Sequence, residues 1–199
     1  MRIGILGGSF DPIHNGHMHM AKCACQYKGL DEVWLIPTGH SPHKDEQKMT
    51  SPKDRYAMCQ LAAFTDDRIK VSTVELDSTG KNYTYITLEK LTTQYPMHEF
   101  FFIMGGDSLD YFEQWVHPER ICELAKILVI PRDRYHHSYL EKKAGEIKQL
   151  FPCHIEIISC ENYPLSSTEI RARLKQNIAK EEDFPEGVLN YIRTHALYQ

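Results

Sequence analysis

Two histidines and a pair of glycines stand close together near the N-terminus. Residues 7–17 read GGSFDPIHNGH, and they follow a branched apolar run at residues 3–6 that predicts a buried strand. Residues 18–27 contain neither proline nor glycine, so we expect a helix to begin near Asn15 or Gly16. The backbone N–H groups and the dipole at such a helix start attract phosphate. His14 and His17 are spaced i, i+3, so both can point at that ligand from one helix face.

Three other interpretations of this segment compete with a phosphate site. A Gly-Gly turn by itself is often only loop punctuation. The two histidines could ligate a metal, but the segment has neither the HExxH spacing nor a cysteine that would support zinc, so we predict no metal ligands here. The chain also lacks the Gly-x-x-x-x-Gly-Lys-Ser/Thr loop of P-loop nucleotidases. A histidine-assisted phosphate site remains as the prediction.

Two motifs resemble those of a known family. GGSFDPIHNGH resembles the HxGH signature of the nucleotidyltransferase superfamily, and its DPxHxGH form resembles that of the nicotinate-mononucleotide adenylyltransferases. Residues 165–171, LSSTEIR, are similar to the superfamily's second motif, (I/L)-S-S-T-x-I-R. The resemblance extends from Gly4 to about Arg193. It implies adenylyl transfer from ATP to nicotinate mononucleotide, giving deamido-NAD and pyrophosphate, a step of NAD biosynthesis.

Two alternative functions stay open beside that one. The acceptor could be nicotinamide mononucleotide, because the two pyridine nucleotides differ only in a carboxylate against a carboxamide. The chain could also be a nucleotide-sensing module that kept the fold and lost the activity.

The resemblance implies a role for each matched position. The implied catalytic residues are His14 and His17, with His17 meeting the charge at the α-phosphate of ATP. The residues implied to bind ATP are Gly7, Gly8, Ser9, Phe10, Lys44, Gly105, Asp107, Arg132, Ser167, Thr168 and Arg171. Those implied to bind the mononucleotide are Thr84, Tyr111 and Trp115. Mg²⁺ is implied to arrive bound to ATP.

The chain departs from the family pattern at a few of these positions. Ser41 stands where the family's Pro-Pro-His-Lys loop has its first proline, and Asp133 and Arg134 replace the proline and glycine that usually follow Arg132. Thr38 and Gly39 stand where an asparagine is frequent.

Some matched positions also have a purely structural interpretation. Ser166 and Glu169 have the spacing of a capping box, which by itself only starts a helix. Asp107 or Ser108 could cap the helix that follows the Gly-Gly-Asp-Ser turn. Trp115 could be an ordinary core residue.

Apolar runs alternate with helical segments along the chain, which predicts a Rossmann-like, doubly wound parallel sheet in an α/β/α three-layer arrangement. We expect one domain over residues 1–199, with a helical C-terminal portion of about 166–199 packed on it, and a polar lid loop at residues 40–49. The predicted strands are residues 3–6, 33–36, 69–74, 100–104, 127–130 and 155–158. Further predicted helices are residues 52–64, with Ser51 as N-cap, 85–95 and 139–151.

Composition is that of an ordinary globular enzyme. The 199 residues are 42% hydrophobic and 25% charged, and the formal net charge of −4 argues against a nucleic-acid partner. The six cysteines form no CxxC pair, and neither a secretory signal nor an 18-residue apolar span is evident, so we expect a cytoplasmic protein without a membrane partner and with six reduced thiols. The oligomeric state is not indicated.

Overall fold

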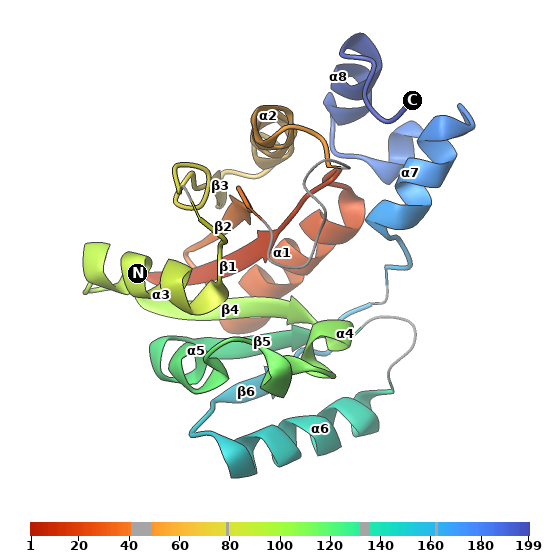
Figure 1. The fold of residues 1–199 in the computed structure, drawn as a ribbon. Helices are drawn as coiled ribbons and strands as arrows, with labels where there is room; N and C mark the ends of the chain where they lie inside the picture. The colour runs from red at the N-terminus through yellow and green to blue at the C-terminus, as the bar shows by residue number, and fades with distance from the viewer. Residues whose placement is uncertain (41–48, 79, 132–135, 162) are drawn as a thin grey trace.

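Six parallel strands form one sheet in the computed structural model, which describes residues 1–40, 49–78, 80–131, 136–161 and 163–199. The strand order is β3-β2-β1-β4-β5-β6, and every neighbouring pair is parallel (Figure 1). The chain builds outward from β1 to β3 and then returns to the other side of β1 with β4, so the order reverses between β1 and β4. Ligands of such sheets bind at the carboxyl ends of the strands beside that reversal. The strands are β1 (Arg2–Gly8), β2 (Glu32–Pro37), β3 (Ile69–Val71), β4 (Glu99–Gly105), β5 (Lys126–Ile130) and β6 (Ile155–Ile157).

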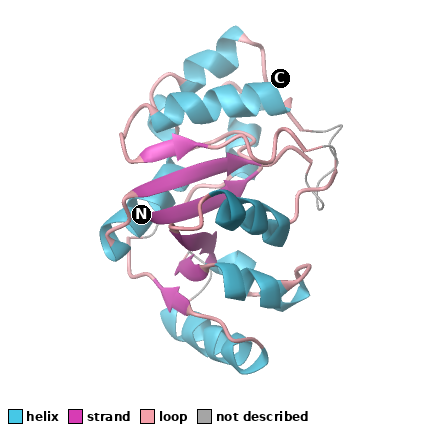
Figure 2. Ribbon diagram, turned by 90° about the vertical axis from the view of Figure 1, so that its left-hand side faces the viewer, coloured by secondary structure: helices cyan, strands magenta, loops and turns pink. Residues whose placement is uncertain are grey.

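Helices cover both faces of the sheet (Figure 2), and each face has its own apolar core. One core is completed by α1 (Asn15–Lys28), α2 (Pro52–Ala63), α7 (Ser167–Lys175) and α8 (Val188–Thr194). The other is completed by α3 (Thr84–Gln94), α4 (Gly106–Leu109), α5 (Pro118–Leu124) and α6 (His137–Leu150). Two short 3-10 helices, η2 (Phe112–Gln114) and η3 (Glu181–Asp183), complete the described elements. The predicted three-layer α/β fold is confirmed. Within the described ranges, no helix has both the length and the apolar content to cross a bilayer.

The predicted elements agree best with the structure where the signal is local. Helix α1 begins at Asn15, as predicted, and Ser51 caps α2 by accepting a hydrogen bond from the Asp54 N–H group. Strands β3 and β6 have only three residues each, shorter than the predicted runs at 69–74 and 155–158, because each is an edge strand paired on one side. The short helix α5 was not predicted, since seven residues are too few for a helical period to stand out, whereas α8 lies within the helical portion predicted at about 166–199.

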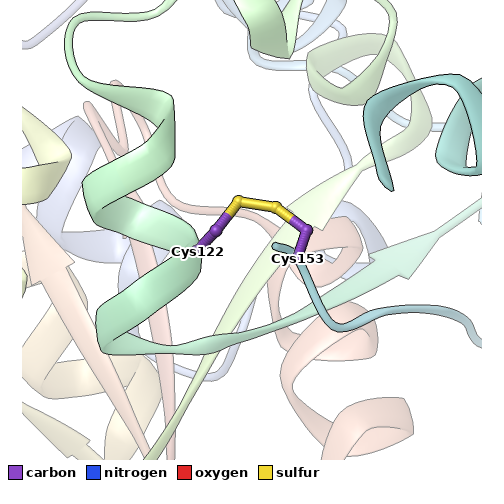
Figure 3. The surroundings of a disulfide bond; sticks show 2 residues. All are labelled: Cys122 and Cys153. Atoms are coloured by element: carbon purple, nitrogen blue, oxygen red, sulfur yellow. A yellow bond between two sulfur atoms is a disulfide. The ribbon is translucent and has the colours of Figure 1, made fainter. Parts of the chain in front are cut away.

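One expectation about the cysteines is wrong. Cys122 in α5 and Cys153, between α6 and β6, are joined by a disulfide bond (Figure 3), so the chain does not have six reduced thiols. The fold brings their Cα atoms within 4.7 Å, inside the range that a disulfide bridges. The two residues are 31 positions apart and belong to no spacing motif, so their proximity is a tertiary feature. The other four cysteines, Cys23, Cys25, Cys59 and Cys160, are free thiols.

Candidate functional site

A cavity of about 360 Å³ opens at the carboxyl ends of β1 and β4, where the strand order reverses. This volume lies in the range of small-molecule pockets. Its wall joins segments that are far apart in the sequence, from β1, α1, α3, the turn after η2, and α7. Eight predicted site residues line it: Gly7, Gly8, Ser9, His17, Thr84, Tyr111, Trp115 and Ser167.

His14 and His17 together cap the start of α1. His14 is the N-cap, and its Nδ1 accepts a hydrogen bond from the Gly16 N–H group at 3.1 Å. His17 reaches back so that its Nδ1 accepts the His14 N–H group at 3.2 Å. A neutral imidazole that accepts through one nitrogen carries its proton on the other, so these bonds assign Nε2–H to each ring. The rings lie against each other with centroids 3.8 Å apart.

The structure separates the two histidines by exposure. His17 lines the cavity, whereas His14 is fully buried and contributes no atom to its wall. Gly16 has to be glycine at this place, because a Cβ there would lie 2.9 Å from the His14 ring and 3.3 Å from the Leu165 carbonyl oxygen. The edge of the His17 ring is also held by Phe10, whose ring centroid lies 5.0 Å away. His17 is therefore the histidine positioned to donate into the cavity.

The turn between β1 and α1 is irregular, and its carbonyl groups find partners in other elements. The Gly8 carbonyl accepts from the Thr38 N–H group at 2.9 Å, and the Asp11 carbonyl accepts from Arg171 at 2.7 Å. The Pro12 carbonyl accepts from the Ser167 hydroxyl at 3.3 Å. Buried carbonyls without partners are costly, so these bonds fix the turn in one conformation.

A further donor to the turn is Arg55 in α2, a buried residue that the sequence analysis did not identify. Its side chain is 1% exposed and donates to three carbonyls, those of Thr50 at 3.0 Å, Ser9 at 2.7 Å and Thr38 at 2.7 Å. Burial lowers the pKa of this guanidinium, and the neighbouring Asp11 carboxylate raises it. Arg55 thus joins the glycine-rich turn, the end of β2 and the start of α2.

Asp11 connects the same turn to the C-terminus. Its carboxylate is buried and accepts the Tyr198 hydroxyl at 2.7 Å and the Thr50 N–H group at 3.3 Å. Burial, together with the charge of Asp11, raises the pKa of Tyr198, so this hydroxyl stays a donor.

The motif at residues 165–171 starts α7 beside the cavity. Ser166 is the N-cap and accepts the Glu169 N–H group at 3.2 Å, but the Glu169 carboxylate pairs with Arg173 at 2.6 Å instead of returning to Ser166. Only half of the predicted capping box is therefore present. Ser167 faces the cavity, while the two other predicted phosphate ligands face an adjoining cleft; that cleft is lined by Met49, Thr50, Thr168, Arg171, Ala172, Lys175, Tyr198 and Gln199.

Aromatic side chains form another part of the cavity wall. Trp115 is partly buried, packs its ring against Phe102 and Phe112 with centroid distances of 6.0 and 5.5 Å, and also lines the cavity. The core and the binding interpretations of this residue therefore coexist. Thr84 is the first residue of α3, and Tyr111, 45% exposed, lies at the rim.

The other predicted site residues lie further from the cavity or outside the described ranges. Gly105 ends β4 and is the N-cap of α4, so neither Asp107 nor Ser108 caps that helix, contrary to the structural interpretation. Asp107 is exposed and does not line the cavity, whereas Ser108 does. Lys44 and Arg132 belong to the segments 41–48 and 132–135, which lie outside the described residues, as does most of the predicted lid.

Glu75 is a buried carboxyl group in the cavity wall that the sequence did not reveal. It is 7% exposed, and its Oε1 accepts the Thr87 hydroxyl at 2.6 Å. Burial raises the pKa of this carboxyl, against hydrogen bonds from Thr87 and Thr38 that lower it. The Glu75 backbone also explains the glycine at position 39, because a Cβ there would overlap the Glu75 carbonyl oxygen.

Comparison with known proteins agrees with this geometry. A model of the cytidylyltransferase-like family matches residues 5–173. A protein of Oceanobacillus iheyensis named "Probable nicotinate-nucleotide adenylyltransferase" is 36% identical over 98% of this chain and 96% of its own length. One of Clostridium tetani with the same name is 33% identical over 98% of both chains. The chain belongs to the nicotinate-nucleotide adenylyltransferase family within the cytidylyltransferase-like proteins.

A solved structure supports the fold of this family member. The nicotinic acid mononucleotide adenylyltransferase of Plasmodium falciparum, complexed with NaAD, has a TM-score of 0.79 and 22% identity, covering 99% of this chain and 97% of that one. The family model and the two relatives confirm the predicted membership in a nucleotidyltransferase family, and the predicted role of each residue stays a prediction.

Replacing Arg55 should cost much more stability than replacing an exposed arginine. Arg55→Met removes a buried guanidinium and its hydrogen bonds to three part-buried carbonyls, so we expect the free energy of unfolding to fall by about 3 to 5 kcal/mol. The matched control is Arg68→Met, because the Arg68 side chain is half exposed and pairs with Asp66 at the surface; there we expect a loss of less than about 1 kcal/mol. Urea unfolding of both variants measures the difference, and equal losses would contradict a positioning role for Arg55.

Proposed function

We propose that this adenylyltransferase joins ATP and nicotinate mononucleotide into deamido-NAD and pyrophosphate. The observation that carries the proposal is that elements from both faces of the sheet line one cavity at the β1/β4 reversal. His17 of α1 and Ser167 of α7 come from one face, and we call this part the phosphate end; Thr84 of α3 and Trp115 come from the other, and we call this part the pyridine end. The first part suits a phosphate chain, and the second suits an aromatic ring that carries an anion.

At the phosphate end, donors surround the place where negative charge develops. The start of α1 supplies a helix dipole, and His17 supplies an Nε2–H donor. The adjoining cleft carries Thr168, Arg171 and Lys175, which suit the β- and γ-phosphates. We assign His17 to the α-phosphate, and we assign His14 the task of orienting His17, because His14 is buried. The ATP roles of Gly105, Asp107, Lys44 and Arg132 remain part of this proposal.

The reaction needs no nucleophile from the protein. A phosphate oxygen of the mononucleotide attacks the α-phosphorus of ATP, the new P–O bond forms as the bond to the β-phosphate oxygen breaks, and pyrophosphate leaves with the electron pair. Positioning both substrates and stabilising charge supply the catalysis. Mg²⁺ enters as part of the ATP complex, since it keeps several of its waters and needs few protein ligands.

At the pyridine end, the start of α3 favours a carboxylate over a carboxamide. The N-cap Tyr83 makes no side-chain hydrogen bond to the first turn, whose N–H groups therefore suit an anion beside Thr84. A carboxamide would turn its NH₂ donor toward at least one of these N–H donors. Glu75 lies in the same wall, and burial raises the pKa of its carboxyl group.

The choice of acceptor tests the proposed function directly. Purified enzyme with Mg–ATP should release pyrophosphate with nicotinate mononucleotide, with kcat/KM at least about a hundredfold above the value for nicotinamide mononucleotide. Comparable values would favour the nicotinamide alternative. No release with either acceptor would favour the nucleotide-sensing module.

His17 can be tested separately from its capping role. Glutamine at the third helical position can accept the N-cap N–H group, so His17→Gln keeps the cap and loses the imidazole donor. We expect kcat for this variant to fall about 10²-fold or more with nearly unchanged melting temperature, and His17→Ala to lose about 1 kcal/mol of stability as well. His137→Ala is the control, because His137 lies at the exposed start of α6. Normal turnover of the Gln variant would remove His17 from the mechanism.

The two tryptophans provide a matched test of ring stacking. Trp115→Leu should weaken nicotinate mononucleotide binding by about 1 to 3 kcal/mol and leave ATP binding unchanged, because leucine fills the core but does not stack. Trp34 on β2 packs against the same core without lining the cavity, so Trp34→Leu should lower stability and spare both affinities. Separate titrations of each substrate with thermal melting decide the matter; parallel behaviour of the two variants would leave Trp115 a core residue only.

A further inference from the structure

A histidine and two cysteines lie close together between α1 and the segment that follows β6, and none of them lines the cavity. His19 and Cys23 are one helical turn apart, and Cys160 approaches them from the segment between β6 and α7. The ligand atoms of the three side chains all lie within 4.8 Å of one another. Among the described residues, these three form the group of at least three His, Cys, Asp or Glu side chains that lie close enough together to hold one metal ion.

The two nitrogen–sulfur distances in this cluster fit a tetrahedral ligand set. His19 Nε2 lies 3.4 Å from Cys23 Sγ and 3.7 Å from Cys160 Sγ. A tetrahedral Zn²⁺ with bonds of about 2.3 Å to sulfur and about 2.0 to 2.1 Å to nitrogen holds a sulfur and a nitrogen ligand about 3.6 Å apart. Both measured separations are within about 0.2 Å of that value.

We propose that His19, Cys23 and Cys160 form a zinc-binding site, with the fourth position taken by water or by Glu161. Two thiolates and an imidazole are the donors that zinc prefers, and the set would tie α1 to the segment that leads into Ser166 and α7. The site is distinct from the catalytic cavity, whose wall contains none of the three residues.

The protons of the cluster are accounted for in the binding step. The His19 ring nitrogen Nε2 lies 2.6 Å from the Glu161 carbonyl oxygen, so the metal-free ring carries its proton there. Binding moves that proton to Nδ1 and releases one proton from each thiol, two in all, as two Zn–S bonds form.

The experiment uses the full chain, handled without oxygen so that Cys23 and Cys160 stay reduced while the Cys122–Cys153 disulfide stays intact, and stripped of metal with a chelator. Added Zn²⁺ should bind at one equivalent per chain after desalting, and it should raise the melting temperature by roughly 5 to 10 °C at a hundred times Kd. Co²⁺ in the same site should give an intense thiolate-to-metal charge-transfer band. That band separates this site from metal held by His14 and His17, which offer no thiolate.

Substitutions decide which residues bind. His19→Ala, Cys23→Ser and Cys160→Ser should each lower zinc affinity at least about tenfold, and each cysteine variant should lose about half of the band, while pyrophosphate release stays near normal. Cys25→Ala is the matched control, because Cys25 lies in the same helix and is buried outside the cluster; its metal binding should match the parent.

Three results would overturn the proposal. One is the absence of stoichiometric binding while Cys23 and Cys160 are reduced. Another is a band of unchanged intensity in Cys23→Ser and Cys160→Ser. The third is a Cys23–Cys160 disulfide that forms readily in air, together with a reduced protein that binds neither Zn²⁺ nor Co²⁺. That result would make the two cysteines a redox pair instead of metal ligands.

Discussion

The structure depends on holding an irregular turn in place inside the protein. Residues 9–13 lie between β1 and α1 in no helix or strand, and polar groups inside a protein need hydrogen-bond partners. Arg55 of α2 donates to the Ser9 carbonyl, and Ser167 and Arg171 of α7 donate to those of Pro12 and Asp11. At the end of β1, the Gly8 carbonyl accepts from Thr38, the residue after β2. Each of these elements is thereby held against the turn that also forms part of the cavity wall.

The histidine pair likewise combines a structural and a functional task. His14 and His17 use one ring nitrogen each to cap α1, which assigns the proton to the other nitrogen of each ring. The cap thus orients a donor as well as stabilising the helix, and it explains why a buried and a cavity-lining histidine occur three residues apart. Around them, the reversal of strand order between β1 and β4 opens the space that the substrates require.

Prediction from the sequence was strongest for the central strands and for motifs that act locally. The central strands β1, β2, β4 and β5 are buried on both faces, so each appears in the sequence as a continuous apolar run. The edge strands β3 and β6 are shorter and have weaker apolar patterns. The glycine-rich turn and the Ser166 cap lie within a few residues of the groups they bind. Trp115 shows the limit of such reasoning, since its core and cavity contacts coexist on two sides of one ring.

The sequence by itself determined the α/β class, the order of the principal elements, the helix start at Asn15 and the family, because these depend on periodicity, capping and contiguous motifs. Only the tertiary structure decided that His17 rather than His14 lines the cavity, that Arg55 and Glu75 are buried beside it, and that Cys122 meets Cys153. It also decided that Cys160 approaches His19, 141 residues away. These outcomes require knowing which distant segments pack together, and residue spacing along the chain carries no record of that.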